Sequence, residues 1–167
     1  GEKTTNERLI EKIVTHIGKV KSRFVGSTQV AGYVERLEIV GLGPFRAKFD
    51  TGNGTKASMF HVDKLEIKGK TARWERDGKK FTNNIVGVSH PTHVDKIDKR
   101  PIVLVDLKFN NKLYKDVPIG LTTRDSKSTF LINRELLTRL KVAVNPDRKF
   151  VLSSYIERGD NNDIDYR

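Results

Sequence analysis

The stretch RPIVLVDLKFNNKLYKDVPIGL, residues 100–121, decides the fold. Its first half places two sets of side chains on opposite faces, Ile102, Leu104, Asp106 and Lys108 against Val103, Val105, Leu107 and Phe109. A period of two residues is typical of a β-strand. Asn110-Asn111 then supplies a two-residue turn, so the stretch predicts a β-hairpin.

Further strand-like segments precede this hairpin. Residues 29–50, QVAGYVERLEIVGLGPFRAKFD, predict a hairpin that turns at the sequence GLGP. Residues 61–81 predict two more short strands, with turns at residues 68–70 and at Asp77-Gly78.

Two elements follow the hairpin of residues 100–121. Residues 132–140, INRELLTRL, predict a short helix, and residues 149–155, KFVLSSY, predict a last strand. Many short strands with one short helix near the C-terminus predict a mainly β protein that folds as a small closed barrel.

The N-terminal residues predict an amphipathic helix over residues 4–18. Thr4 and Glu7 have the spacing of a capping box, and Gly18 is a natural stop. One apolar face recurs at helical spacing: Leu9, Ile10, Ile13, Val14 and Ile17. Such a face either packs on the helix's own domain or docks on a partner protein.

The chain therefore divides into three parts. We expect a helical arm and linker over residues 1–28, the barrel over residues 29–156, and a polar acidic tail over residues 157–167. A length of 167 residues suits one domain with short appendages.

The composition restricts the chemistry. The absence of cysteine excludes disulfides, cysteine-based zinc sites and a thiol nucleophile. No apolar run approaches the ~20 residues that cross a bilayer, so we expect no membrane contact and a cytoplasmic location. The net charge of +11 suits nucleic acid or an acidic protein. Because the basic residues are spread along the chain without interleaved aromatic residues, we do not expect a dedicated nucleic-acid binder.

Asp50, Thr51 and Gly52 form the most informative short motif. The triplet ends a predicted strand, where it is either an ordinary acidic turn or a carboxylate held in place for chemistry. Aspartic peptidases use two carboxylates that share one proton, with one accepting a proton from water and the other donating to the scissile carbonyl. The chain has one such triplet, because Asp125-Ser126 is followed by Lys127 instead of glycine.

A longer resemblance supports the chemical interpretation. Residues 32–153 resemble the bacterial and phage family labelled ATP-dependent zinc protease, which is similar in fold to the retropepsins. The resemblance rests on the Asp-Thr-Gly triplet, on residues 100–124, and on FLINRELL and VAVNPDRKFVL further on. It implies a retropepsin-like barrel in which Asp50, Thr51 and Gly52 are catalytic. With half a dyad per chain, it implies a homodimer.

The resemblance also implies roles for three further residues. His61, Arg124 and Arg134 match family positions, and we expect them to contact a peptide substrate. Some members of the family are linked to the trimming of acidic, glutamate-rich tails, so the substrate is expected to be acidic. The alternative for the arginines is pairing with the chain's own acids.

The sequence departs from the family pattern in two places. Asn53 replaces an alanine, and Gly54-Thr55 resembles an insertion. Asn133 replaces a glycine beside the catalytic loop, a change that we interpret through the tolerance of asparagine for left-handed backbone angles.

No metal or cofactor is expected. His90, His93, Asp95 and Asp98 lie close in sequence, but the intervening proline does not favour a helix that would bring them together. There is no His-Glu-x-x-His motif and no phosphate-binding glycine loop, so the words zinc and ATP in the family label have no support.

Residues 62–90 occupy the place of a retropepsin flap, and we expect Asp77-Gly78 to close over a substrate as its tip. Trp74 is expected in the core or at the substrate.

The rival hypothesis belongs to another class of protein. A binding or assembly module, for example a phage structural protein associated with the virion, could retain the barrel without catalysis, and the predicted N-terminal helix would suit it.

Overall fold

The computed structural model describes residues 4–22, 28–90 and 99–153. Its elements, in chain order, are α1 (Thr5–Ser22), β1 (Gln29–Ile39), β2 (Gly43–Phe49), β3 (Ser58–His61), β4 (Lys64–Lys68), β5 (Thr71–Arg76), β6 (Lys79–Asn84), β7 (Gly87–Ser89), β8 (Arg100–Phe109), β9 (Lys112–Thr122), β10 (Phe130–Ile132), α2 (Arg134–Leu140) and β11 (Val142–Lys149).

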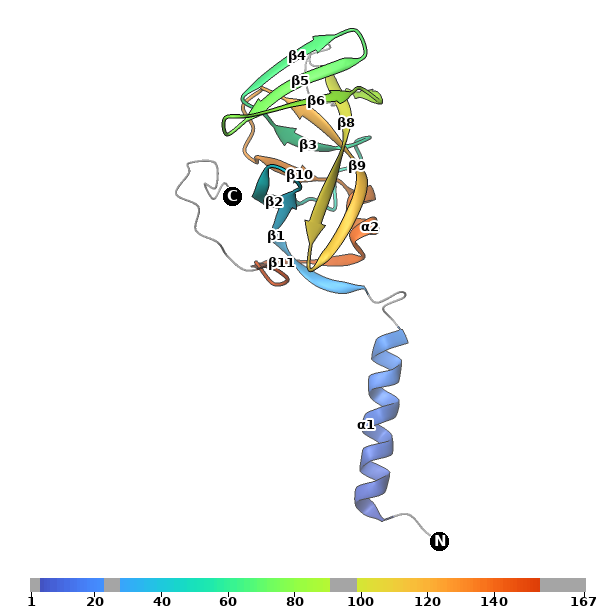
Figure 1. Ribbon diagram of the computed structural model, residues 1–167. Coiled ribbons are helices and arrows are strands. Elements are labelled where there is room, and N and C mark those ends of the chain that lie inside the picture. The colour runs from blue at the N-terminus through green and yellow to red at the C-terminus, as the bar shows by residue number, and fades with distance from the viewer. Residues whose placement is uncertain (1–3, 23–27, 91–98, 154–167) are drawn as a thin grey trace.

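Strands β1, β2, β10, β3, β9 and β8 follow one another around a closed barrel (Figure 1). The barrel closes where β1 pairs with β8, at Glu38 opposite Lys108 and Ile39 opposite Leu107. β11 extends the sheet beside β1, β7 extends it beside β8, and β4, β5 and β6 form a separate three-stranded sheet. The expected mainly β barrel with a short C-terminal helix and a preceding N-terminal helix is therefore confirmed.

Aromatic side chains fill the barrel. Phe60 lies at its centre, with the Phe45 and Phe130 rings meeting it edge to face at centroid distances of 5.0 and 5.3 Å. Trp74 of β5 extends this cluster at 6.2 Å and stacks on Phe81 of β6. Trp74 is thus a core residue that joins the small sheet to the barrel.

The alternation in the sequence located the hairpins correctly. The hairpins β1–β2 and β8–β9 lie where expected, and Asn110 and Asn111 both have the positive φ angles of a tight hairpin turn. Residues 61–81 differ from expectation. Two strands were predicted there, but the structure has three, β4, β5 and β6, after His61 ends β3.

Two predicted ends were wrong. Helix α1 runs through Gly18 to Ser22, because a glycine weakens a helix by ~1 kcal/mol without ending it. The last strand is β11 at residues 142–149, not residues 149–155. Phe150 has φ of 53°, which ends the extended backbone there.

A buried carboxylate fastens the chain after β11 to β1. Glu35 is fully buried and accepts hydrogen bonds from the backbone N–H of Gly32 at 2.7 Å, of Val151 at 3.0 Å and of Ser153 at 3.0 Å, and from the Ser153 hydroxyl at 2.7 Å. Gly32 is required here, since a Cβ would lie 3.0 Å from the Lys149 Cα of the neighbouring strand.

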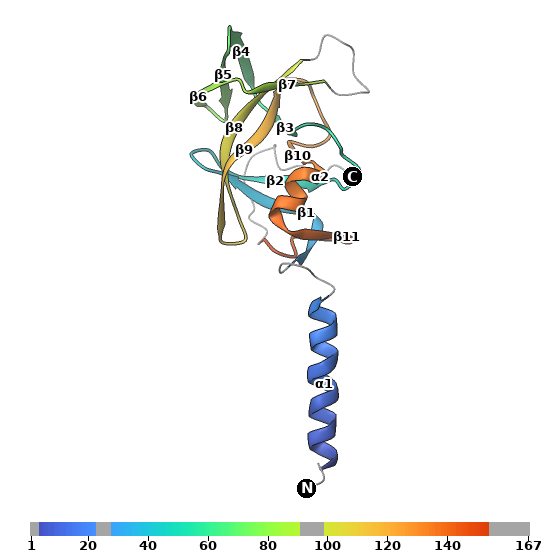
Figure 2. The ribbon, with the colours of Figure 1, turned by 90° about the vertical axis from the view of Figure 1, so that its right-hand side faces the viewer.

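Helix α1 stands apart from the barrel in both ribbon views (Figures 1 and 2). Leu9, Ile10, Ile13 and Val14 are 51 to 62% exposed, so this part of the apolar face does not pack on the barrel. No described helix is long and apolar enough to cross a membrane.

We predict that Glu35→Gln lowers the free energy of unfolding by about 3 kcal/mol, because the amide would turn an NH₂ group toward buried N–H donors. Urea denaturation measures the change. Glu38→Gln on the same strand is the matched control. Its side chain is 42% exposed, and its ion pair with Lys108 is worth under ~0.5 kcal/mol. Equal effects of the two substitutions would contradict the prediction.

Candidate functional site

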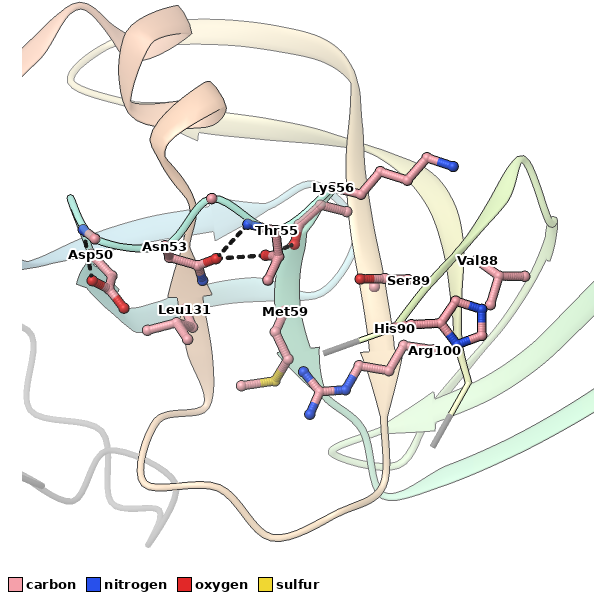
Figure 3. Close-up of a pocket in the computed structure, with 14 residues that line it drawn as sticks. Asp50, Asn53, Thr55, Lys56, Met59, Val88, Ser89, His90, Arg100 and Leu131 are labelled. Carbon is pink, nitrogen blue, oxygen red and sulfur yellow. Dashed lines mark hydrogen bonds between the residues drawn. The ribbon is translucent and has the colours of Figure 1, made fainter. Parts of the chain in front are cut away.

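Asp50 lies where β2 ends at one end of the barrel. Its backbone N–H donates to the carbonyl of Ile132 at 3.1 Å, which extends the parallel pairing of β2 with β10 by one residue. Its carboxylate Oδ1 accepts from the Gly52 N–H at 3.1 Å, and the side chain is half-buried (Figure 3). The strand therefore fixes the backbone of Asp50, and the turn fixes its carboxylate.

The loop after Asp50 is held by hydrogen bonds of Asn53. The Asn53 carbonyl accepts from the Arg134 N–H at 2.9 Å, at the start of α2. The Asn53 side-chain oxygen accepts from the Thr55 N–H at 2.9 Å and from the Thr55 hydroxyl at 2.6 Å (Figure 3). Asn53, Gly54 and Thr55 thus form an ordered turn, for which an alanine at position 53 could not supply the side-chain acceptor.

Asn133 connects this loop to the body of the protein. It is the N-cap of α2, and its side-chain oxygen accepts from the Leu136 N–H at 3.0 Å and from the Ser58 hydroxyl at 3.1 Å. Its side-chain NH₂ donates to the Thr55 carbonyl at 2.8 Å. The interpretation through left-handed backbone was wrong, because Asn133 has φ of −80° and ψ of 169°. The asparagine is used for its side chain, which is buried and hydrogen-bonded through both its oxygen and its nitrogen.

We predict that Asn133→Ala lowers the free energy of unfolding by about 2–4 kcal/mol. The change removes an N-cap and leaves the buried Ser58 hydroxyl and the Thr55 carbonyl with one partner fewer. Asn133→Ser, which can still cap α2, should lose about half as much, by chemical denaturation. Losses under ~0.5 kcal/mol for both variants would show that Asn133 does not anchor the loop.

A cleft of about 870 Å³ opens beside Asp50. Residues of the loop after β2 line one side, and residues of β7, β8 and the segment after β7 line the other. The basic side chains in the lining are those of Lys56 and Arg100, and the His90 imidazole also lines the cleft (Figure 3). Sequence reasoning did not single out Lys56 or Arg100. The pairing of Arg100 with Ser89 across β8 and β7, which brings Arg100 to the cleft, has no local sequence signal.

The two expected arginines have different surroundings. Arg134 begins α2 beside the Asp50 loop, and its guanidinium lies so close to Gly54 that a Cβ there would collide with Nη2. Arg124 is exposed on the segment after β9, where its backbone N–H donates to the Thr122 hydroxyl at 3.1 Å. Neither arginine belongs to the cleft lining, and the structure brings only Arg134 to the loop.

His61 lies at the other end of β3 from Ser58. Its Nδ1 is 3.2 Å from Nη1 of Arg76, which also donates to the His61 carbonyl at 2.9 Å. Arg76 is 1% exposed and lies between the Phe45 and Phe60 rings. Because a guanidinium only donates, Nδ1 is the acceptor and Nε2 carries the proton, 4.0 Å from Asp125. His61 does not line the cleft, so its contact is with this buried arginine.

The β5–β6 turn is fixed away from the cleft. The Asp77 N–H donates to the Asp63 carboxylate at 2.9 Å, and neither Asp77 nor Gly78 lines the cleft. The strands that contribute residues to the cleft lining are β3, β7, β8, β9 and β10, and the β5–β6 turn is not among them. The segment between β7 and β8, residues 91–98, lies outside the described residues, and so do His93, Asp95 and Asp98 of the metal hypothesis. No group of metal-ligating side chains occurs in the described parts of the chain.

A solved structure resembles this one, and the match covers the whole of that other chain. It is the Legionella pneumophila protein Lpg0085, described as a protein of unknown function (DUF785), with a TM-score of 0.61 and 26% sequence identity. The two chains share a fold. The match covers 76% of this chain and 100% of Lpg0085, so about a quarter of this chain has no counterpart in that structure. No protein-family model and no curated protein matches the chain.

Proposed function

We propose that the protein is a retropepsin-like aspartic peptidase that hydrolyses a peptide bond with the Asp50 carboxylates of two copies of the chain. The observation that carries the proposal is the presentation of Asp50 at the wall of a cleft, on a loop bonded to β10 and α2. A carboxylate fixed by its own turn and by its strand is preorganised for proton transfer.

The mechanism needs both carboxylates. One Asp50 is ionised and removes a proton from water, whose oxygen attacks the scissile carbonyl carbon. The other Asp50 is protonated and donates to the carbonyl oxygen, which gives a tetrahedral diol. Proton transfer to the amide nitrogen then breaks the C–N bond. One chain supplies one of these carboxylates, so the active species is a dimer with the two-fold axis between them.

Thr51 and Gly52 fit this arrangement. Thr51 is exposed and, within the described residues, its hydroxyl has no bonded partner, so it is available to the second copy. Gly52 donates its backbone N–H to the Asp50 Oδ1 at 3.1 Å and so helps to fix the carboxylate.

The edge of β7 offers a backbone on which an extended peptide could bind. β7 is the last strand in the order of the eight-stranded sheet, and its residue Val88 lines the cleft. An extended peptide can add to such an edge as a further strand.

The charges of the cleft favour an acidic peptide. Lys56 and Arg100 line the same cleft as Asp50, and the chain as a whole carries a net charge of +11. Glutamate side chains on both sides of the scissile bond would meet these cations, and the positive field would attract an acidic substrate.

We predict that Asp50→Asn reduces cleavage of a glutamate-rich peptide library by about 10³-fold or more, measured by mass spectrometry between pH 4 and 7. Asp125→Asn is the matched control, because Asp125 is the other Asp followed by a hydroxyl residue and does not line the cleft. If both variants lose activity, the second catalytic carboxylate is Asp125 of the same chain, and the shared dyad is contradicted. Absence of cleavage by the wild type would favour a binding or assembly module.

We predict that Arg100→Gln raises KM for acidic peptides about tenfold and leaves KM for neutral peptides nearly unchanged, since one charge contact is worth roughly 1.4 kcal/mol. Lys127→Gln, an exposed cation outside the cleft, is the control. Steady-state kinetics on paired glutamate and glutamine peptides measure the difference. An equal KM change for both peptides would contradict a role in charge recognition.

A further inference from the structure

The apolar face of α1 is uncovered in the single chain. Leu9, Ile10, Ile13 and Val14 are 56, 59, 51 and 62% exposed. Four large aliphatic side chains on one helix face form a surface of the kind that a partner covers. The sequence continues the same face with Ile17 and Val20.

The start of this helix is built without help from the barrel. The Thr4 N–H donates to the Glu7 carboxylate at 3.0 Å, and the Glu7 N–H donates to the Thr4 hydroxyl at 3.2 Å, which completes a capping box. A lone helix of 18 residues is nevertheless marginal in water. The capped helix therefore gains most of its stability from whatever covers its apolar face.

We propose that a second copy of α1 covers this face in a parallel helix pair, which holds two barrels together so that their Asp50 residues can meet. The choice of a second copy rests on the proposed function, because the site is incomplete without another chain. The other chain is then present in any case, and it carries the same uncovered face.

The orientation follows from the length of the helix. Eighteen residues span ~27 Å, so an antiparallel pair would place the two barrels at opposite ends of a rod. A parallel pair leaves both barrels at the same end. Residues 23–27 can extend over at most ~18 Å, so the two barrels stay within reach of each other. A short tether of this kind raises their effective concentration to the millimolar range.

The sequence also provides a register. Asn6, Ile13 and Val20 are seven residues apart and lie along one line of the apolar face, with Ile10 and Ile17 along the adjacent line. In a parallel pair of this register, Asn6 faces Asn6 of the second copy.

A single introduced cysteine tests the orientation, because the chain has none of its own. In a parallel pair, the two Cα atoms at position 6 lie within the Cα–Cα separation that a disulfide allows. We therefore expect Asn6→Cys to cross-link nearly completely under mild oxidation. In an antiparallel pair the two thiols are ~22 Å apart, and no cross-link forms. Arg8→Cys, on the exposed polar face, is the matched control and should remain uncross-linked.

A second measurement does not depend on cysteine chemistry. Sedimentation equilibrium of the full chain should give a dimer. Ile10→Gln with Ile13→Gln should raise the dimer dissociation constant at least ~100-fold. Arg8→Gln with Lys12→Gln, which replaces two polar-face residues of the same helix, should leave it within about threefold. A monomeric wild type, equal effects of the two double variants, or a mass of three or four chains would overturn the proposal.

Failure of this inference and failure of the proposed function are distinguishable, because cross-linking and mass are measured without a substrate. A cross-linked dimer that cleaves nothing would support the helix pair and contradict the peptidase. A peptidase that stays dimeric with α1 disrupted would support the function and overturn the helix pair.

Discussion

The side chain of Asn133 is the interaction on which the candidate site depends. It caps α2, accepts from Ser58 of β3, and donates to the Thr55 carbonyl of the loop that follows Asp50. Residues 55–58 and the start of α2, which are distant in sequence, therefore share one buried amide. An unpaired amide in this position would be unfavourable, so the two regions keep one arrangement. Asp50 inherits its position from that arrangement, through the loop on one side and β10 on the other.

In the proposed peptidase, the barrel would supply half of the catalytic centre and most of the binding cleft. Closure of the sheet brings the ends of β2 and β3 together with β10, and Asp50 occupies the end of β2. β7 and β8 provide the facing wall, with Arg100 among the cleft cations and an open strand edge at Val88. A second carboxylate would complete the chemistry, and the exposed face of α1 offers a physical means of bringing it. In the proposed peptidase, the basic charge of the chain would attract an acidic substrate.

Sequence patterns predicted the strands of the barrel because the alternation of apolar and polar residues is a local property, as residues 100–121 illustrate. The predictions failed where contacts between distant segments determine which residues form a strand. β11 is an edge strand that tolerates Pro146 and is held by parallel pairing with β1, while the expected strand beyond it is pinned by Glu35 instead. Asp50 was found through its motif. The neighbourhood of Arg100 and the bonding of His61 to Arg76 depend on strand register, which no short motif records.

The most direct test of a dyad shared between two chains is the activity of mixed dimers. Wild-type and Asp50→Asn chains are mixed in varied ratio, allowed to exchange subunits, and assayed on a glutamate-rich peptide. If each site needs Asp50 from both chains, activity falls as the square of the wild-type fraction, to about one quarter in an equal mixture. A linear fall, to about one half, would mean that each chain works alone and would contradict the account.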